Sequence, residues 1–226
     1  MKSNIEFLQN IFLFRCLFDH AAKELERAVQ LLSLRRKQVA YRPGDPSDSV
    51  FVLKSGRIKI GKITQDGREI ILDLLKAGDV FGEMAFLEDA PRESFAEALD
   101  DTDLLVIKKA DLLRLIRHRP AVTYRLAKII GCKRRKAEKN MENFLYKGVR
   151  ERLAILILRL SDDYGIKDSR GKMLRIKITH QDLANLIGSS RETVSLTLGD
   201  FRREGFIEIK ERKIIIKDES ALRQLN

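Results

Sequence analysis

The chain has 226 residues, and its 44 lysines and arginines against 33 acidic residues give a formal charge of +11. Residues 1–118 hold 19 basic and 19 acidic residues, residues 119–147 hold 9 and 2, and residues 148–226 hold 16 and 12. The positive excess therefore lies in the C-terminal half, which favours a polyanionic partner there.

Several classes of protein are excluded by residue type and spacing. Cys16 and Cys132 have no CxxC neighbour, and the three histidines have no metal-ligand spacing, so we expect no disulfide framework and no metal site. The longest apolar stretch, residues 11–18, is short and broken by Arg15, so it fits neither a membrane span nor a secretory signal. With no catalytic motif either, we expect a cytoplasmic protein that is not an enzyme and has no membrane partner.

The first third of the chain changes from a helical to a strand-like period. Apolar spacing predicts helix over residues 4–37. Glycines 44, 56, 67 and 78 then separate short β-type runs at intervals of 12, 11 and 11, which is typical of a small antiparallel barrel or jelly roll. The predicted strands are Val39–Tyr41, Val50–Leu53, Arg57–Ile63, Glu69–Leu74 and Asp103–Ile107.

A long helix is predicted next, from about Ala110 with a break at Pro120 and an end near Tyr146. Its apolar residues are too many for one small barrel to cover, so we expect a homodimer formed through this helix. The run of four basic residues at 133–136 is either a solvated helix face or a contact for an anion. We expect a hinge at Gly148 and three parts: residues 1–118, 119–147 and 148–226.

The C-terminal part reads as a winged helix-turn-helix. An amphipathic helix over Val149–Leu160 is followed by a polar loop, residues 161–171, and a short strand, residues 174–178. Thr179 can cap one helix, Gly188 permits a sharp turn, and a second helix begins at Ser189 or Ser190. A hairpin over residues 207–217 supplies the wing.

The start of the second helix carries side chains that suit base edges and phosphates. Arg191 can donate twice to guanine, Glu192 can accept from cytosine, and hydroxyls can hold phosphate near the helix dipole. The alternative is that Ser189 and Glu192 form only a capping box. The predicted DNA-binding residues are Thr179, His180, Gln181, Ser189, Ser190, Arg191, Glu192 and Thr193. The first three are expected to contact the DNA backbone.

A second candidate site lies in residues 78–96. A glycine turn, a short helical piece and a lone arginine can cradle an anion between backbone amides and one guanidinium, although glycine turns in barrels are usually only turns. The predicted effector-binding residues are Gly82, Glu83, Met84, Arg92 and Glu93.

Both motifs resemble one family. Phe81-Gly82-Glu83-Met84-Ala85 followed by Pro91-Arg92 resembles the phosphate-binding cassette of cyclic-nucleotide-binding domains. Gly188-Ser189-Ser190-Arg191-Glu192-Thr193-Val194 resembles the recognition element of the cyclic-AMP receptor protein and fumarate-nitrate-reductase regulator (CRP/FNR) family. The resemblance implies an α+β fold with an N-terminal β jelly roll that senses an effector, a long dimerisation helix and a winged helix-turn-helix. It also implies a homodimer on an inverted-repeat operator in double-stranded DNA, with RNA polymerase as a partner.

Departures from the family pattern concern the effector. The resemblance implies that Glu83 binds the ribose hydroxyl and that Arg92 binds the cyclic phosphate. Glu93, however, stands where cyclic-nucleotide binders carry Ser or Thr. Its carboxylate would repel a phosphate 4 Å away by about 4 kcal/mol at an effective dielectric constant of 20. Ala137 and Glu138 replace an adenine-facing Thr-Ser pair. We therefore expect a regulator that answers to an effector other than cyclic AMP or is active without one; the alternative is activation by cyclic AMP or cyclic GMP. No cofactor is marked by the residues.

Overall fold

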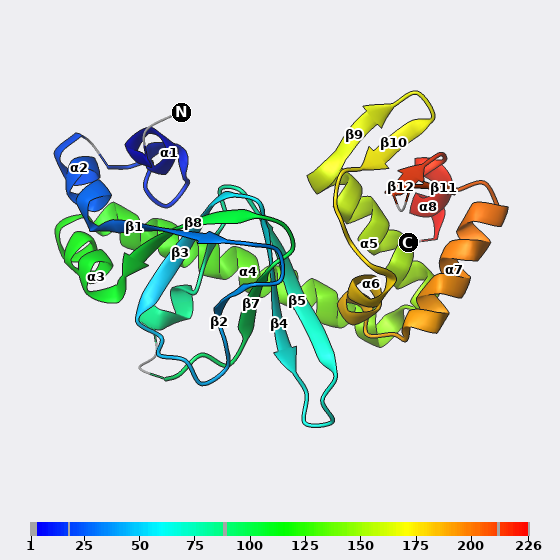
Figure 1. The fold of residues 1–226 in the computed structure, drawn as a ribbon, viewed down its shortest axis with the longest axis horizontal. Coiled ribbons are helices and arrows are strands. Elements are labelled where there is room, and N and C mark those ends of the chain that lie inside the picture. Colours follow the sequence, from blue (N-terminus) through cyan, green and yellow to red (C-terminus); the bar gives the residue numbers. More distant parts are fainter. Residues whose placement is uncertain (1–3, 18, 88–89, 212, 226) are drawn as a thin grey trace. The chain divides into compact units, whose positions relative to one another are not determined.

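A computed structural model describes residues 4–17, 19–87, 90–211 and 213–225 (Figure 1). The chain divides into two compact units, residues 1–68 with 72–136 and residues 69–71 with 137–226. Glu88 and Asp89 in the predicted cassette, and Arg212 in the predicted hairpin, lie outside the described residues.

The N-terminal unit is built on two four-stranded sheets, ordered β1-β8-β3-β6 and β2-β7-β4-β5. Pairs such as β1 with β8 and β4 with β7 are antiparallel, so the predicted jelly roll is confirmed. The strands are β1 (Val29–Leu34), β2 (Val39–Tyr41), β3 (Ser49–Ser55), β4 (Arg57–Ile63), β5 (Glu69–Lys76), β6 (Val80–Phe81), β7 (Phe95–Ala98) and β8 (Thr102–Lys108).

The predicted helix over residues 4–37 is wrong in its last third. Helix α1 (Asn4–Asn10) and helix α2 (Asp19–Ala28) form, but the chain then enters β1, whose Val29 lies opposite Ile107 of β8. The apolar spacing near residues 28–32 fits a helix and a strand about equally. Pairing with a strand more than 70 residues away decides the outcome.

Aromatic rings fill the barrel beside the cassette. The ring centroids of Tyr41 and Phe51 are 5.7 Å apart, and those of Phe51 and Phe81 are 5.1 Å apart. Phe81 is 1% exposed and immediately precedes Gly82 of the cassette. Ring packing of this kind stabilises beyond the area it buries, so the cassette starts from a rigid strand end.

Gly56 joins β3 to β4 with a φ of +81°, and a Cβ there would lie 2.3 Å from Thr102 Oγ1 and 2.6 Å from the Asp101 carbonyl oxygen. We expect Gly56→Ala to destabilise the barrel by more than the roughly 1–2 kcal/mol of left-handed strain alone. Gly67→Ala is the matched control, because φ is +80° and nothing lies within 4 Å of its Cβ. Urea unfolding followed by circular dichroism compares the two; equal midpoints would contradict the close contact.

Two helices follow the barrel, as predicted with a break at Pro120. Helix α3 (Lys109–His118) ends before it, and Pro120 begins helix α4 (Pro120–Tyr146), where proline costs no hydrogen bond. Val122 and Leu126 pack into the core formed with α1, α2 and α3. Toward its end α4 exposes Met141, Leu145 and Tyr146 by 64%, 65% and 81%.

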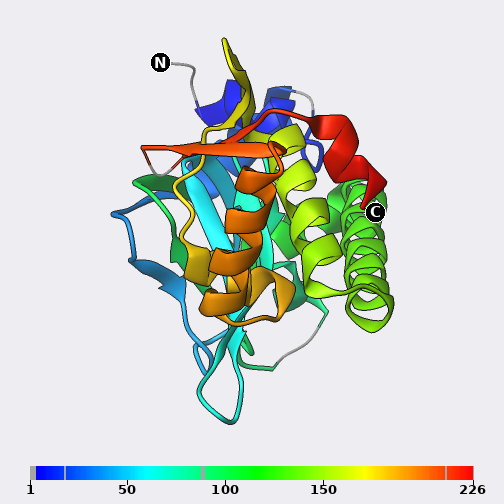
Figure 2. The same ribbon diagram turned by 90° about the vertical axis from the view of Figure 1, so that its right-hand side faces the viewer.

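The C-terminal unit contains a four-stranded sheet, ordered β11-β12-β10-β9, and four helices beside it (Figure 2). The predicted strand over 174–178 is wrong, because the pairing with β12 holds β10 at residues 171–174, and the predicted loop over 161–171 contains β9. The elements are α5 (Val149–Tyr164), β9 (Gly165–Asp168), β10 (Gly171–Leu174), α6 (His180–Ile187), α7 (Arg191–Arg203), β11 (Ile207–Lys210), β12 (Lys213–Ile216) and α8 (Glu219–Gln224).

Candidate functional site

Helix α6 begins with a complete capping box. The Thr179 hydroxyl oxygen accepts from the Asp182 backbone N–H at 3.0 Å, and the Asp182 carboxylate accepts from the Thr179 N–H at 2.9 Å. The Thr179 hydroxyl also donates to that carboxylate at 2.6 Å. The proton of the Thr179 hydroxyl is therefore used inside the protein. The exposed Gln181 donates from Nε2 to Asn185 Oδ1 at 2.8 Å, which leaves its second amide hydrogen for a ligand.

The turn between α6 and α7 depends on Gly188. Its φ is +59° and its ψ is +51°, the left-handed conformation, and its N–H donates to the Ala184 carbonyl as a helix C-cap. Ser189 follows, with its N–H donating to the same carbonyl at 3.0 Å. Leu183, Ala184 and Ile187 of α6 are buried together with Val194, Leu198 and Phe201 of α7. Ala184 is fully buried, and its small side chain permits a close approach of the two helices.

Ser190 is the N-cap of α7. Its hydroxyl oxygen accepts from the Thr193 backbone N–H at 3.1 Å and lies 3.0 Å from the Thr193 hydroxyl oxygen. The alternative in which Ser189 and Glu192 form a capping box is therefore wrong. The helix starts one residue later, so Glu192 is at the second helical position and forms no capping box with Ser189.

Arg191, Glu192 and Thr193 are all exposed at the tip of α7. Hydrogen bonding from its own backbone N–H, aided by the Ser190 hydroxyl, lowers the pKa of the Glu192 carboxyl below its ordinary value. Glu192 is thus a carboxylate at neutral pH. Within the described part of the chain, no hydrogen bond or ion pair holds the Arg191 guanidinium. The start of α7 therefore presents the Arg191 guanidinium as a hydrogen-bond donor and the Glu192 carboxylate as an acceptor.

His180 is held by a contact with α7 that no sequence pattern predicts. Its Nδ1 lies 2.8 Å from the Ser195 hydroxyl oxygen, and that hydroxyl donates to the Arg191 carbonyl at 2.8 Å. Because the serine proton is directed to the carbonyl, His180 Nδ1 must carry the hydrogen and donate to Ser195. This places the start of α6 against the first turn of α7.

The cassette in the barrel surrounds a buried arginine. Gly82 has a φ of +75° and precedes the short 3-10 helix η1 (Glu83–Phe86). Arg92, 7% exposed, donates from Nη1 to the Gly82 carbonyl at 3.1 Å and from Nη2 to the Ser49 carbonyl. Its guanidinium carbon lies 4.5 Å from the centre of the Tyr41 ring. Burial lowers the pKa of Arg92, and its buried Nε has no hydrogen-bond acceptor among the residues that the structure describes.

Glu93 faces away from that arginine. Its carboxylate pairs with Lys62 on β4 at 2.6 Å, and its side chain is 74% exposed. The hydrogen bond from Lys62 lowers the pKa of Glu93. The premise that Glu93 repels a phosphate at Arg92 therefore fails, because the Glu93 carboxylate is exposed and paired with Lys62 whereas the Arg92 side chain is buried.

Ser94 was missed by the sequence reasoning. It is half-buried, and its side chain hydrogen-bonds Tyr41, the ring over which the Arg92 guanidinium lies. No local sequence pattern marks it, because Tyr41 lies more than 50 residues earlier in the chain. Tyr41 itself has a raised pKa because of burial, so it stays a neutral hydroxyl group beside Arg92.

The other cassette residues are divided between the interior and the surface. Glu83, 7% exposed, pairs with Lys133 of α4 at 2.8 Å, and Lys133 also donates to the Val80 carbonyl at 2.9 Å. Met84 is 44% exposed. The cassette is therefore tied to α4 through an ion pair 50 residues apart in sequence.

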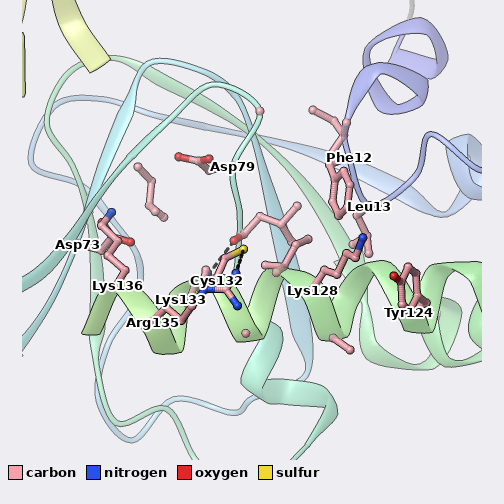
Figure 3. Close-up of a pocket in the computed structure, with 17 residues that line it drawn as sticks. Phe12, Leu13, Asp73, Asp79, Tyr124, Lys128, Cys132, Lys133, Arg135 and Lys136 are labelled. Carbon is pink, nitrogen blue, oxygen red and sulfur yellow. Dashed lines mark hydrogen bonds and ion pairs between the residues drawn. The ribbon is translucent and has the colours of Figure 1, made fainter. Parts of the chain in front are cut away.

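Figure 3 shows Lys133, Arg135 and Lys136 from the basic run of α4 beside a cavity, whose volume is about 950 Å³. Lys136 pairs with Asp73, and Arg135 donates to Cys132 Sγ at 3.2 Å. With Lys133 bound to Glu83, at least two of the four basic residues are neutralised inside the unit. The run is therefore not an unpaired cationic surface. Neither a solvated helix face nor a contact for an anion describes all four of its residues.

The two sites and the fold define a class: a DNA-binding transcription regulator with a cyclic-nucleotide-binding type of barrel. Residues 31–119 match the profile "Cyclic nucleotide-binding domain", and residues 151–225 match "Crp-like helix-turn-helix domain". The chain is 32% identical over 211 residues to the "Anaerobic regulatory protein" of Bacillus subtilis, covering 91% of this chain and 89% of that one. It belongs to the CRP/FNR family of transcription regulators.

Two further relatives cover most of the chain. The "CRP-like cAMP-activated global transcriptional regulator" of Mycobacterium tuberculosis is 27% identical over 217 residues, 96% of this chain and 97% of that one. FixK2 from Bradyrhizobium japonicum has a TM-score of 0.78 and 25% identity, covering 88% of this chain and 97% of that one. The relatives are regulators and not enzymes, in agreement with the sequence.

Among the described residues, no helix has the length and apolar character that a membrane span requires.

Proposed function

We propose that this regulator is a homodimer that reads an inverted-repeat operator with the tips of two α7 helices. The observation that carries the proposal is the exposed start of α7, where the Arg191 guanidinium has no hydrogen-bond or ion-pair partner among the described residues and Glu192 is an exposed, ionised carboxylate. Arg191 suits guanine and Glu192 suits cytosine. Ser189, Ser190 and Thr193 are proposed to hold phosphate or base edges, and His180 and Gln181 to contact the DNA backbone. Thr179 is proposed to position the start of α6 for these contacts, since both of its protons are donated to Asp182.

The dimer is proposed to form through α4. Met141, Leu145 and Tyr146 are exposed on it, and apolar side chains on a long helix are covered most simply by a second copy of the same helix. This corresponds to a division into an effector domain, residues 1–118, a dimerisation helix, residues 119–147, and a DNA-binding domain, residues 148–226. Membership of the family supports RNA polymerase as a further partner. It also supports a location in the cytoplasm, where the DNA is.

Binding by cations predicts a characteristic salt response. Affinity for the operator is expected to fall linearly on a double-logarithmic plot against salt concentration, because lysines and arginines displace counterions from phosphates. Lys213→Ala, on the exposed start of the wing strand β12, should weaken binding about equally on operator and random duplexes and lower the salt slope by about one. Fluorescence anisotropy at several salt concentrations measures both. A salt-independent affinity would contradict DNA binding through this surface.

We propose that the barrel takes an anionic effector at Arg92, other than cyclic AMP, or holds the regulator active without one. The buried Nε of Arg92 without an acceptor supports an anion site. Against cyclic AMP stand Ala137 and Glu138, which offer no hydroxyl to adenine. One observation favours the second candidate, a cyclic-nucleotide-gated activator: Glu93 is paired with Lys62 and leaves the phosphate position open.

Titration calorimetry with cyclic AMP and with cyclic GMP separates the two candidates. We expect no saturable heat from the wild-type protein. Glu93→Ser should not create one, because that carboxylate already points to solvent. A saturable heat that Arg92→Ala abolishes would establish the cyclic-nucleotide candidate in place of the first.

A further inference from the structure

Helix α7 has two opposite faces. Val194, Thr197, Leu198 and Phe201 are buried at the spacing of one helical stripe. Glu192 and Leu196 lie on the other side, four residues apart and therefore one above the other. Leu196 is 71% exposed, and among the large hydrophobic residues in the described part of the chain only Tyr146 is more exposed.

The surroundings of Leu196 do not form a hydrophobic patch. Its neighbours on that side are Glu192 and Gly199, and a Cβ at Gly199 would have nothing within 4 Å. Leu196 is thus a lone apolar side chain on a polar face, with open space one turn further along the helix. A protein partner would require a larger apolar area than one side chain offers.

We infer that Leu196 reads a thymine in each half-site through the thymine C5-methyl group. The inference rests on the proposed function, in which this face of α7 lies in the major groove. Leucine has no hydrogen-bond donor or acceptor. Opposite guanine, adenine or cytosine it would therefore exclude water from polar atoms of the base edge without giving them a hydrogen-bond partner. The thymine methyl is the one apolar group that the major groove displays.

The position of this thymine follows from helix geometry. Glu192 and Leu196 are separated by four residues, about 6 Å along the axis at 1.5 Å per residue. Base pairs are stacked about 3.4 Å apart. The thymine is therefore expected within about two base pairs of the cytosine that Glu192 contacts, on either strand.

Replacing thymine by deoxyuridine removes only the methyl group and tests this directly. The probe is the duplex that the full-length protein selects from a random-sequence pool, with each thymine replaced in both half-sites at once. Burying one methyl group corresponds to about fourfold in affinity, so two half-sites give about fifteenfold. We expect one thymine position to show this loss, measured by fluorescence anisotropy at fixed salt.

Protein variants assign the effect to the side chain. Leu196→Ala should bind the thymine and deoxyuridine duplexes equally at that position, while Leu31→Ala, which removes a 56% exposed leucine from the barrel strand β1, should keep the fifteenfold difference. In a new selection, Leu196→Arg should exchange the thymine for guanine, because arginine donates to guanine O6 and N7.

Two results would overturn the inference while leaving the proposed function intact: selection of an operator in which no thymine is sensitive to deoxyuridine, or a sensitivity that persists in Leu196→Ala. If no duplex is enriched over the random pool, the proposed function itself fails, and the inference fails with it.

Discussion

Arg191→Ala is expected to weaken operator binding by about 1–3 kcal/mol per half-site, and by about twice that for a dimer that contacts two half-sites. The loss should be confined to sequences that carry the guanine Arg191 contacts, so discrimination at one position per half-site should disappear. The reason is that Arg191 stands exposed at the start of α7 without a side-chain partner among the described residues, so its whole donor fork is available to a base. Binding to a panel of single-base operator variants measures this.

Arg202→Ala is the matched control for that experiment. Arg202 is also exposed and lies on the same helix, but at its far end. Its removal takes away the same charge, so it should change affinity evenly across the panel and leave base preference as it is. If Arg191→Ala also weakens all sequences alike, Arg191 contacts only phosphate and the assignment of its base contact is wrong.

Phe201→Ala is expected to cost the C-terminal unit about 3–5 kcal/mol, a large share of the stability of an ordinary domain. Phe201 is 0% exposed, its ring centre lies 6.0 Å from that of Phe206, and the Arg150 guanidinium carbon lies 5.0 Å from its ring centre. Truncation leaves a cavity beneath α7 and removes both ring contacts. DNA binding should be lost with the fold of this unit.

Hydrogen exchange resolves where that destabilisation occurs. Amides in residues 137–226 should lose protection in Phe201→Ala, while those of the barrel strands should keep it, because the two units have separate cores. Leu196→Ala is the control on the same helix, since a side chain 71% exposed contributes within about 0.5 kcal/mol. Equal loss of protection in both variants would contradict the assignment of Phe201 to the core.

The helix-turn-helix could be predicted because its determinants are local. The Thr179 cap, the left-handed Gly188 and the buried spacing of Val194, Leu198 and Phe201 all lie within 23 residues. Each favours the same structure, and no distant partner is needed to decide it. The strands between glycine turns were predicted for a similar reason, since turns such as the one at Gly56 need a positive φ.

The incorrect predictions concern residues whose structure is decided by a partner that is distant in sequence. Residues 29–34 carry a spacing that suits a helix, yet β8 pairs with them. The family motif predicts Glu93 beside the phosphate because it occupies the position of a Ser or Thr, but its carboxylate pairs with Lys62, 31 residues earlier. The ion pair of Lys133 with Glu83 could not be predicted either, because composition says only that a basic run exists. Effector residues are harder to predict than the DNA-reading tip because they come from several strands and one helix.

The spacing of half-sites tests the account most directly. Sequences that the full-length protein selects from random DNA should contain an inverted repeat whose half-site centres are about 34–36 Å apart, one duplex turn, and inserting five base pairs between the halves should abolish binding. Sedimentation of the complex should show two chains per duplex. Selection of a single, unrepeated half-site bound by one chain, or equal binding with and without the insertion, would contradict a dimer that reads DNA with paired α7 helices.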